Sequence, residues 1–105
     1  MKSLKFTSEL SEKILAGKKT GTWRLFDDKN LELGDELELI NKSTDEVFAR
    51  AKITSLKFKK LGEVTKEEIA GKYKDFDEMY RIQKGHYGDK VDENTEVKMI
   101  EFKLI

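Results

Sequence analysis

Five stretches of the chain alternate apolar and polar residues, which is the pattern of a strand with one buried face. The stretches span residues 2–6, 22–25, 36–41, 47–58 and 97–105. Most are separated by short polar turns, so neighbouring strands are expected to pair antiparallel. The spacing therefore predicts one antiparallel-rich sheet as the centre of the fold.

The longest stretch changes phase within itself. Its apolar face runs from Val47 to Ile53, and the alternation then slips by one residue before Leu56 and Phe58. Such a slip in a long strand indicates a β-bulge or the corner of a barrel. With the number of strands, it predicts an α+β fold: a small, mixed, mostly antiparallel β-barrel with helices packed against it. The lysines around Phe58 are interpreted as a solvated strand edge that discourages edge-to-edge pairing.

A first helix is expected directly after residues 2–6. Thr7 is a good N-cap, and Leu10 and Ile14 lie four residues apart on one apolar stripe. Gly17 is a natural stop after the last turn.

Two more helices are expected between the long stretch and the last strand. Residues 65–68 fit a capping box, and the short helix that they begin should end at Gly71. Asp75 begins the next helix, which Gly85 is expected to end. Residues 85–89, with the single histidine His86, are therefore predicted to form a loop.

The composition limits the function classes. The chain has 105 residues, which is enough for one core, and a single domain is expected over 1–105. Charged residues make up 40% of the chain, but Lys plus Arg and Asp plus Glu are equal at 21 each, so the net charge is zero. A strong non-specific nucleic-acid binder is usually basic, so that class is not supported, whereas binding through a local basic patch stays open.

The absence of cysteine excludes disulfides, thiol catalysis and cysteine metal sites. One histidine cannot form a multi-histidine site, and neither a metal nor another cofactor is expected. No apolar run approaches the roughly 20 residues that cross a bilayer, and Lys2 and Lys5 do not precede the apolar segment of a signal peptide. We therefore expect a cytoplasmic protein without membrane contact, and a monomer is favoured.

Residues 17–24, Gly-Lys-Lys-Thr-Gly-Thr-Trp-Arg, gather chemically useful side chains and the only tryptophan. In a strand, Thr20, Thr22 and Arg24 would share one face, with Trp23 on the other. Lys19 would lie at the entrance. An ammonium, hydroxyls and a guanidinium in one small volume suit an anionic or carbonyl-bearing ligand. The alternative is a basic helix end followed by an ordinary Thr-rich strand.

This stretch resembles the ASCH domain family. The family signature is Gly-x-Lys-x-x-x-x-Arg after the first helix, here Gly17, Lys19 and Arg24, and the Gly34-Asp35 turn and the closing strand over 97–105 are also similar. The resemblance covers essentially the whole chain. It implies a PUA-like β-barrel related to RNA-binding modules, with RNA or a modified nucleoside as the partner.

One branch of small family members consists of amidohydrolases that act on cytidine acetylated at its exocyclic amine. For this chain the resemblance implies Lys19 and Thr22 as catalytic residues. The family's glutamate belongs in a Gly-x-Glu context between the second and third helices, where this chain has Tyr73 instead. Glu68 or Asp75 could supply the carboxylate, although each also fits a helix-cap role.

The candidate ligand-binding residues are expected to line one pocket. They are Gly17, Lys19, Thr20, Thr22, Arg24, Tyr73 and His86. Three functions stay open: RNA or nucleotide binding in this Lys/Thr/Arg-lined pocket, an amidohydrolase, and a protein-interaction module. If RNA binds, substitution of Lys19 or Arg24 should lower the affinity, and substitution of Lys42 should not.

Overall fold

The computed structural model describes residues 1–27 and 29–105, and its centre is a five-stranded sheet with the strand order β1-β3-β4-β5-β2. The strands are β1 (Lys2–Phe6), β2 (Gly21–Leu25), β3 (Glu36–Asn41), β4 (Glu46–Lys60) and β5 (Glu96–Leu104). β1 and β3 pair parallel, and the other three pairs are antiparallel. The predicted mixed, mostly antiparallel sheet is confirmed.

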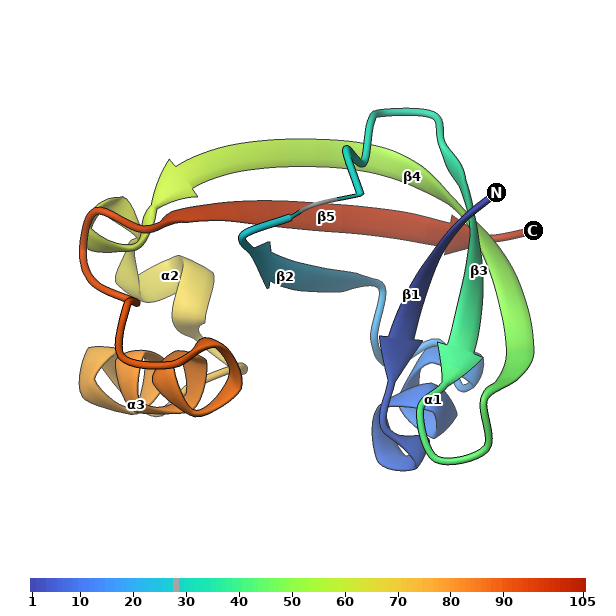
Figure 1. Cartoon of the computed structure of the whole chain (residues 1–105), viewed down its shortest axis with the longest axis horizontal. Helices are drawn as coiled ribbons and strands as arrows, with labels where there is room; N and C mark the ends of the chain where they lie inside the picture. Colours follow the sequence, from blue (N-terminus) through green and yellow to red (C-terminus); the bar gives the residue numbers. More distant parts are fainter. Residues whose placement is uncertain (28) are drawn as a thin grey trace.

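The sheet curls into a half-barrel because β4 and β5 are long and bent, and they span the molecule together (Figure 1). The register of their pairing shifts between Ile53 and Ser55, where the sequence predicts a bulge. β1 and β2 form the two edges of the sheet, whereas β4 is an inner strand between β3 and β5. β3 pairs only with residues 46–52 of β4, however, so the part of β4 around Phe58 pairs with β5 alone and is locally an edge, as the lysines predict.

Four short helical segments connect the strands: α1 (Ser8–Leu15), the 3-10 helix η1 (Leu61–Glu63), α2 (Lys66–Ile69) and α3 (Phe76–Tyr87). The predicted N-cap of α1 forms, with the Thr7 hydroxyl accepting from the Leu10 N–H. The predicted capping box of Thr65 and Glu68 also forms.

The predicted end of α3 is wrong. Gly85 lies inside the helix, and Gly88, with a φ of 92°, follows its last turn. An inner glycine weakens a helix by roughly 1 kcal/mol without blocking it, whereas the left-handed backbone at the end strongly favours glycine. His86 consequently lies on α3 and not in a loop.

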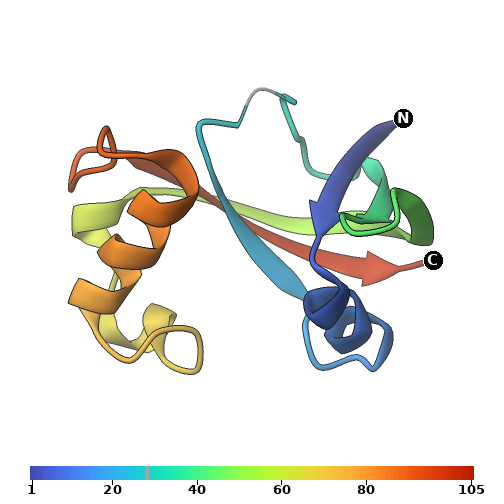
Figure 2. The ribbon, with the colours of Figure 1, turned by 60° about the horizontal axis from the view of Figure 1, so that its bottom comes forward.

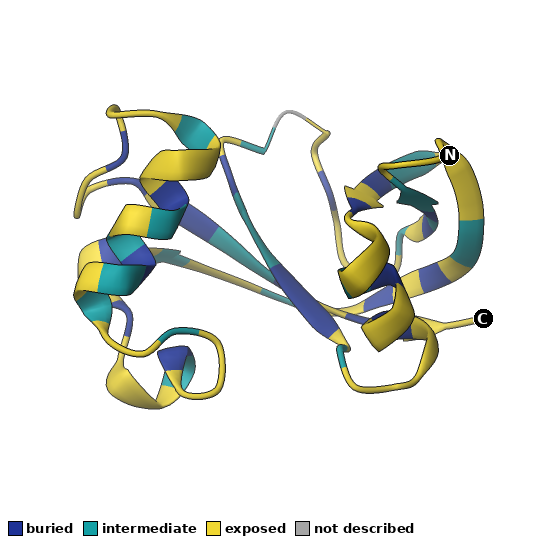
Figure 3. Cartoon of the chain, turned by 90° about the horizontal axis from the view of Figure 1, so that it is seen from below, coloured by how far each residue is buried: buried dark blue, intermediate teal, exposed yellow. Residues whose placement is uncertain are grey.

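The buried apolar side chains form two clusters. One packs α1 against β1, β3 and the middle of the sheet, and the other packs α2 and α3 against the ends of β2 and β5. Viewed with its lower side turned forward, the molecule has α2 and α3 on one side of β2, and β1 and α1 on the other (Figure 2). Figure 3 shows buried and exposed positions interleaved along these elements. β2 thus lies between two separately packed halves.

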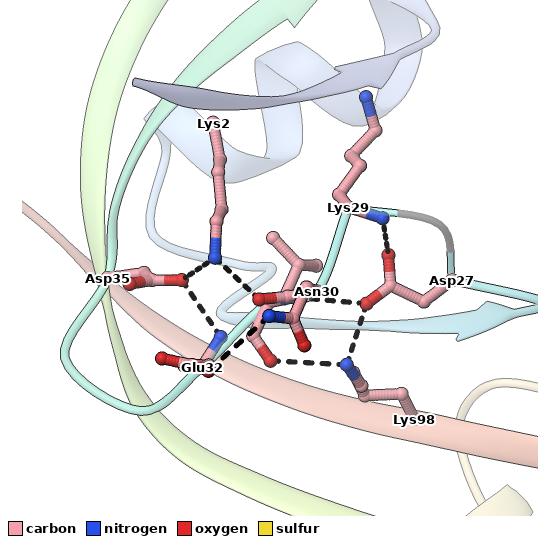
Figure 4. A network of polar contacts seen from close by, with 8 residues as sticks. Lys2, Asp27, Lys29, Asn30, Glu32, Asp35 and Lys98 are labelled. Carbon is pink, nitrogen blue, oxygen red and sulfur yellow. Dashed lines mark hydrogen bonds and ion pairs between the residues drawn. The ribbon is translucent and has the colours of Figure 1, made fainter.

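Ion pairs fix the segment between β2 and β3 to the sheet (Figure 4). Lys98 Nζ on β5 donates to Asp27 Oδ2 at 2.6 Å and to the Leu31 carbonyl at 3.1 Å. Lys2 Nζ on β1 donates to Asp35 Oδ2 at 2.7 Å. Burial works against the charge of Asp27, but hydrogen bonds from Lys98 and from two backbone N–H groups lower the pKa of its carboxyl below the ordinary value.

Candidate functional site

A cleft of about 860 Å³ lies between the two halves of the molecule, along β2. Its walls come from β1, α1, the loop after α1, β2, the turn after β3, the segment between α2 and α3, α3, and one residue of β5. The lining residues are Lys5, Phe6, Thr7, Leu10, Lys13, Lys18, Lys19, Thr20, Gly21, Thr22, Trp23, Arg24, Lys42, Ala70, Gly71, Lys72, Tyr73, Ile82, Gln83, His86, Tyr87 and Glu101. Except for Gly17, every candidate ligand-binding residue that the sequence singles out lines this cleft.

The end of α1 brings Lys19 to the cleft. Gly17 adopts a φ of 76°, and its N–H donates to the Ile14 carbonyl at 3.0 Å. The Lys18 N–H donates to the Lys13 carbonyl at 2.9 Å. These bonds satisfy the last carbonyls of the helix and reverse the chain. Gly17 therefore forms the turn that presents Lys19 and does not itself line the cleft.

β2 supplies side chains to both walls, as the predicted alternation requires. On one side, Arg24 Nη2 donates to the Lys5 carbonyl at 3.1 Å, and the guanidinium carbon lies 5.1 Å from the centre of the Phe6 ring. On the other, the Trp23 ring lies 5.7 Å from the Tyr73 ring between centres. Thr22, two residues before Arg24 and on the same face of the strand, is buried.

The side of the cleft formed by α3 holds its aromatic residues by hydrogen bonds. Gln83 Nε2 donates to the Tyr73 hydroxyl at 2.6 Å. The Leu25 N–H donates to the Tyr87 hydroxyl at 3.4 Å, which ties α3 to β2. His86 lies on the same helix and is exposed at the cleft. These bonds fix the aromatic rings of Tyr73 and Tyr87 on the side of the cleft opposite the basic end of α1.

The lining residues that the sequence patterns did not single out include Glu101 and Lys72. Glu101 lies on β5 opposite Gly21, and its Oε2 accepts a hydrogen bond from the Thr20 hydroxyl at 3.3 Å. Lys72 Nζ lies 5.5 Å from the centre of the Trp23 ring, a cation–π contact. The pairing of β5 with β2 is the signal that places Glu101, and it is not a local property of the sequence.

The cleft is strongly basic although the chain has no net charge. Lysine and arginine provide seven of its lining residues, and Glu101 is the one carboxylate among them. Lys42 is one of the seven, so it is unsuitable as the outside control that the sequence suggested. The opposing acidic residues lie elsewhere on the molecule. The cleft can therefore attract an anion without a basic overall charge.

A second cavity of about 510 Å³ lies beside Arg24 and has the opposite character. Three carboxylates line it, Asp27, Asp92 and Glu96, and its Lys98 is already paired with Asp27. This cavity is less suited to an anionic ligand than the cleft.

Burial lowers the pKa of Lys19 from 10.5 to about 8, and the positive charges of Lys72 and Arg24 add to this effect against the opposing charge of Glu101. Desolvation also lowers the pKa of Lys72. Burial raises the pKa of the Tyr73 hydroxyl above its ordinary value. Clustered charges with perturbed pKa values are typical of functional sites.

We expect the substitution Lys19→Met to increase the free energy of unfolding at pH 7 by about 1–2 kcal/mol, because it removes a charge that burial disfavours. Water screens part of the penalty on this partly exposed ammonium, which limits the gain. The folded state disfavours the charge and the unfolded chain does not, so the stability of the wild type should rise between pH 8 and 10.5 relative to the variant. Urea unfolding at several pH values measures both effects. Lys52→Met, at an exposed position, is the matched control. A loss of stability in Lys19→Met would contradict this account.

Glu68 and Asp75, the two proposed substitute carboxylates, do not line the cleft. Glu68 accepts hydrogen bonds from Lys57 at 2.9 Å and Lys59 at 2.7 Å. The bond from Lys59 is the main reason why the pKa of Glu68 falls to about 2. Asp75 caps α3 by accepting from the Glu78 N–H at 2.8 Å. The geometry assigns both residues structural roles.

Among residues 1–27 and 29–105, no cluster of three or more His, Asp or Glu side chains could hold a metal ion. No helix in the same part of the chain has the length and apolar character needed to cross a membrane.

Several solved structures of low sequence identity share this fold. The hypothetical protein PH0355 superposes with a TM-score of 0.74 at 21% identity over 100% of both chains. Protein PF0455 from Pyrococcus furiosus gives 0.70 at 17% identity, over 99% of this chain and 96% of its own. The ASCH domain from Lactobacillus crispatus JV V101 gives 0.60 at 16% identity, over 90% and 69%. No curated protein matches the chain in sequence.

At these identities the superpositions compare folds alone. The sequence evidence is independent of them: the family model described as "ASCH domain" matches residues 2–105. The curled mixed sheet agrees with that match. The resemblance of residues 17–24 points to the same family. The chain belongs to the ASCH domain family.

Proposed function

We propose that this domain binds RNA or a nucleotide in the cleft along β2. The observation that supports this most is the combination of cationic and aromatic side chains around one cavity. Phosphate is recognised by ammonium and guanidinium groups, and bases stack on aromatic rings. Membership of the ASCH domain family supports the same class of ligand.

The phosphate-binding groups in this proposal are Lys19, Arg24 and Lys72. Arg24 uses one nitrogen on the Lys5 carbonyl, and its Nε has no hydrogen-bond partner among the described residues. The Nε is buried, so the donors left for a ligand are those of Nη1 and the second N–H of Nη2. Lys19 is largely protonated at pH 7, because its pKa of about 8 is still above that value.

The base-binding groups are Trp23, Tyr73 and His86. Lys72 Nζ lies 5.5 Å from the centre of the Trp23 ring, so a phosphate-binding cation and a ring for stacking lie side by side. The volume of about 860 Å³ falls in the range of small-ligand pockets. A nucleotide or a few nucleotides of a single strand fit this size better than a duplex.

A titration of short single-stranded RNA, followed by the fluorescence of Trp23, tests the proposal. Lys19→Ala and Arg24→Ala should each weaken binding roughly tenfold, since each removes a hydrogen bond to a charged group. Because only a few phosphates are contacted, a plot of log affinity against log salt concentration should have a slope of only about −1 to −2. The control Lys52→Ala, which lies outside the cleft, should bind like the wild type. Equal losses in all three variants would indicate diffuse electrostatic attraction and no site.

The lowered pKa of Lys19 also favours a second candidate, deacetylation of cytidine acetylated at its exocyclic amine. In this reaction the neutral Lys19 amine takes the proton of the Thr22 hydroxyl, whose oxygen attacks the acetyl carbonyl. The C–N bond breaks, and the leaving amine takes the proton from Lys19. Water then hydrolyses the acetyl ester on Thr22, which releases acetate and restores the hydroxyl.

The two candidates differ in their dependence on pH. Phosphate binding requires protonated Lys19, so affinity should fall as the pH rises through about 8. The deacetylase reaction requires the neutral amine, so its rate should rise over the same range. The direction of the pH effect therefore distinguishes the two functions of one cleft.

A further inference from the structure

Among the residues that the structure describes, Glu101 is the one carboxylate that lines the cleft, and it does not help to attract an anion. Glu101 lies among seven lining lysine and arginine residues, and its negative charge opposes the binding of phosphate. A group that only accepts hydrogen bonds is suited to a different part of a ligand, one that presents N–H donors.

The absence of a side chain at Gly21 provides the space that the Glu101 carboxylate occupies. Gly21 lies opposite Glu101 in the β2–β5 pair, and a Cβ atom on Gly21 would come within 2.7 Å of Glu101 Oε1 and 2.8 Å of the Ile100 carbonyl. Because Gly21 has no Cβ atom, the Glu101 side chain can lie across β2 at this position. The Thr20 hydroxyl donates to the other oxygen, Oε2, at 3.3 Å. Both oxygens keep lone pairs for a further donor.

The neighbouring cations leave the carboxylate available. The charge of Glu101 acts on both Lys19 and Lys72, yet among the residues that the structure describes neither lysine forms an ion pair with it. Lys72 also lies over the Trp23 ring. Gly21, which pairs with Glu101, lies two residues before Trp23, so the carboxylate and the ring share one face of the sheet. A base on that ring would meet Glu101 as its hydrogen-bond acceptor.

We propose that Glu101 determines which base the cleft accepts, and that it selects guanine. This inference rests on the proposed binding of nucleotides. Guanine presents an imino N–H and an amino group side by side, which match the two oxygens of a carboxylate. Adenine and cytosine present a ring nitrogen with a lone pair beside the amino group, which the carboxylate repels. Uracil has a single N–H between two carbonyl groups.

The experiment measures the affinity of the four ribonucleoside monophosphates GMP, AMP, CMP and UMP by Trp23 fluorescence, with calorimetry as a second readout. We expect the wild type to bind GMP roughly tenfold more tightly than the others, the discrimination of one bidentate pair. Glu101→Gln should lose most of this preference, because an amide pairs with adenine as readily. Gly21→Ala should reduce the preference as well, since the added Cβ displaces the carboxylate and also pushes against the Ile100 carbonyl of β5.

Two controls separate a loss of selectivity from a loss of structure. Inorganic phosphate should bind Glu101→Gln at least as tightly as the wild type, because a negative charge has been removed from a basic cleft. Glu96→Gln, on the same strand but outside the cleft, should keep the preference for GMP. Equal affinity for all four nucleotides, or a GMP preference that survives in Glu101→Gln, would overturn the role of Glu101 and leave nucleotide binding intact. Failure of all four, and of short single-stranded RNA, to bind would instead overturn the proposed function.

Discussion

Replacing Lys98 by methionine should lower the free energy of unfolding by about 3 kcal/mol, close to the cost of breaking a buried ion pair. The side chains of Lys98 and Asp27 are only 12% and 8% exposed, and their atoms are 2.6 Å apart. The variant leaves Asp27 charged in a site that water reaches poorly. Backbone N–H groups of Lys29 and Leu31 still donate to it, which limits the loss.

Urea unfolding at pH 7 measures this effect, and Lys103→Met, an exposed position on the same strand, is the matched control. The pKa of Asp27 is lowered in the folded state, so the contribution of its charge to stability is present above its ordinary value of 3.8 and is lost as the pH falls through the folded pKa. The difference between Lys98→Met and the wild type should accordingly shrink in acid. An unchanged stability at pH 7 would show that the segment between β2 and β3 is not held by this pair.

The second large effect concerns deacetylation. If the protein converts N-acetylated cytidine to cytidine, Lys19→Met and Thr22→Val should each reduce kcat at least about a hundredfold, the usual contribution of a general base or of the group it activates. The double variant should be little worse than either single one, because the two groups act as a unit. The rate of the wild type should rise with pH around a midpoint near 8.

The absorbance change between the two nucleosides measures this activity. Glu68→Gln and Asp75→Asn are informative controls, because both residues cap helices outside the cleft. Both variants should keep the wild-type kcat after any loss of stability is taken into account. A large loss of kcat in a folded Glu68 or Asp75 variant would contradict the structural roles assigned to them.

The parts of the fold that depend on local chemistry could be predicted. The Thr7 cap, the Thr65 capping box and the slip between Ile53 and Leu56 each follow from a few neighbouring residues, and all three are confirmed. The end of α3 was misjudged because Gly85 and Gly88 look equivalent in sequence. Only the backbone at Gly88 turns left-handed.

The parts of the site that depend on long-range pairing could not be predicted. The alternation of residues 20–24 follows from a strand, and the fold brings them to one cleft with Tyr73 and His86. Glu101 enters that cleft only because β5 pairs with β2 in a register that sets it against Gly21. The pairing of β3 with residues 46–52 of β4 likewise depends on long-range contacts, whereas the lysines around Phe58 correctly indicate that the rest of β4 has an open edge.

The central claim, that the cleft along β2 is the ligand site, is tested most directly by NMR. Backbone amide shifts of the wild-type protein are followed while a short single-stranded RNA, and separately GMP, is added. We predict that the largest changes fall on residues 18–24, 70–73, 83–87 and 101, which line or adjoin the cleft. Changes concentrated around Phe26, Phe58 and Glu96 at the second cavity, or spread evenly over the surface lysines, would contradict it.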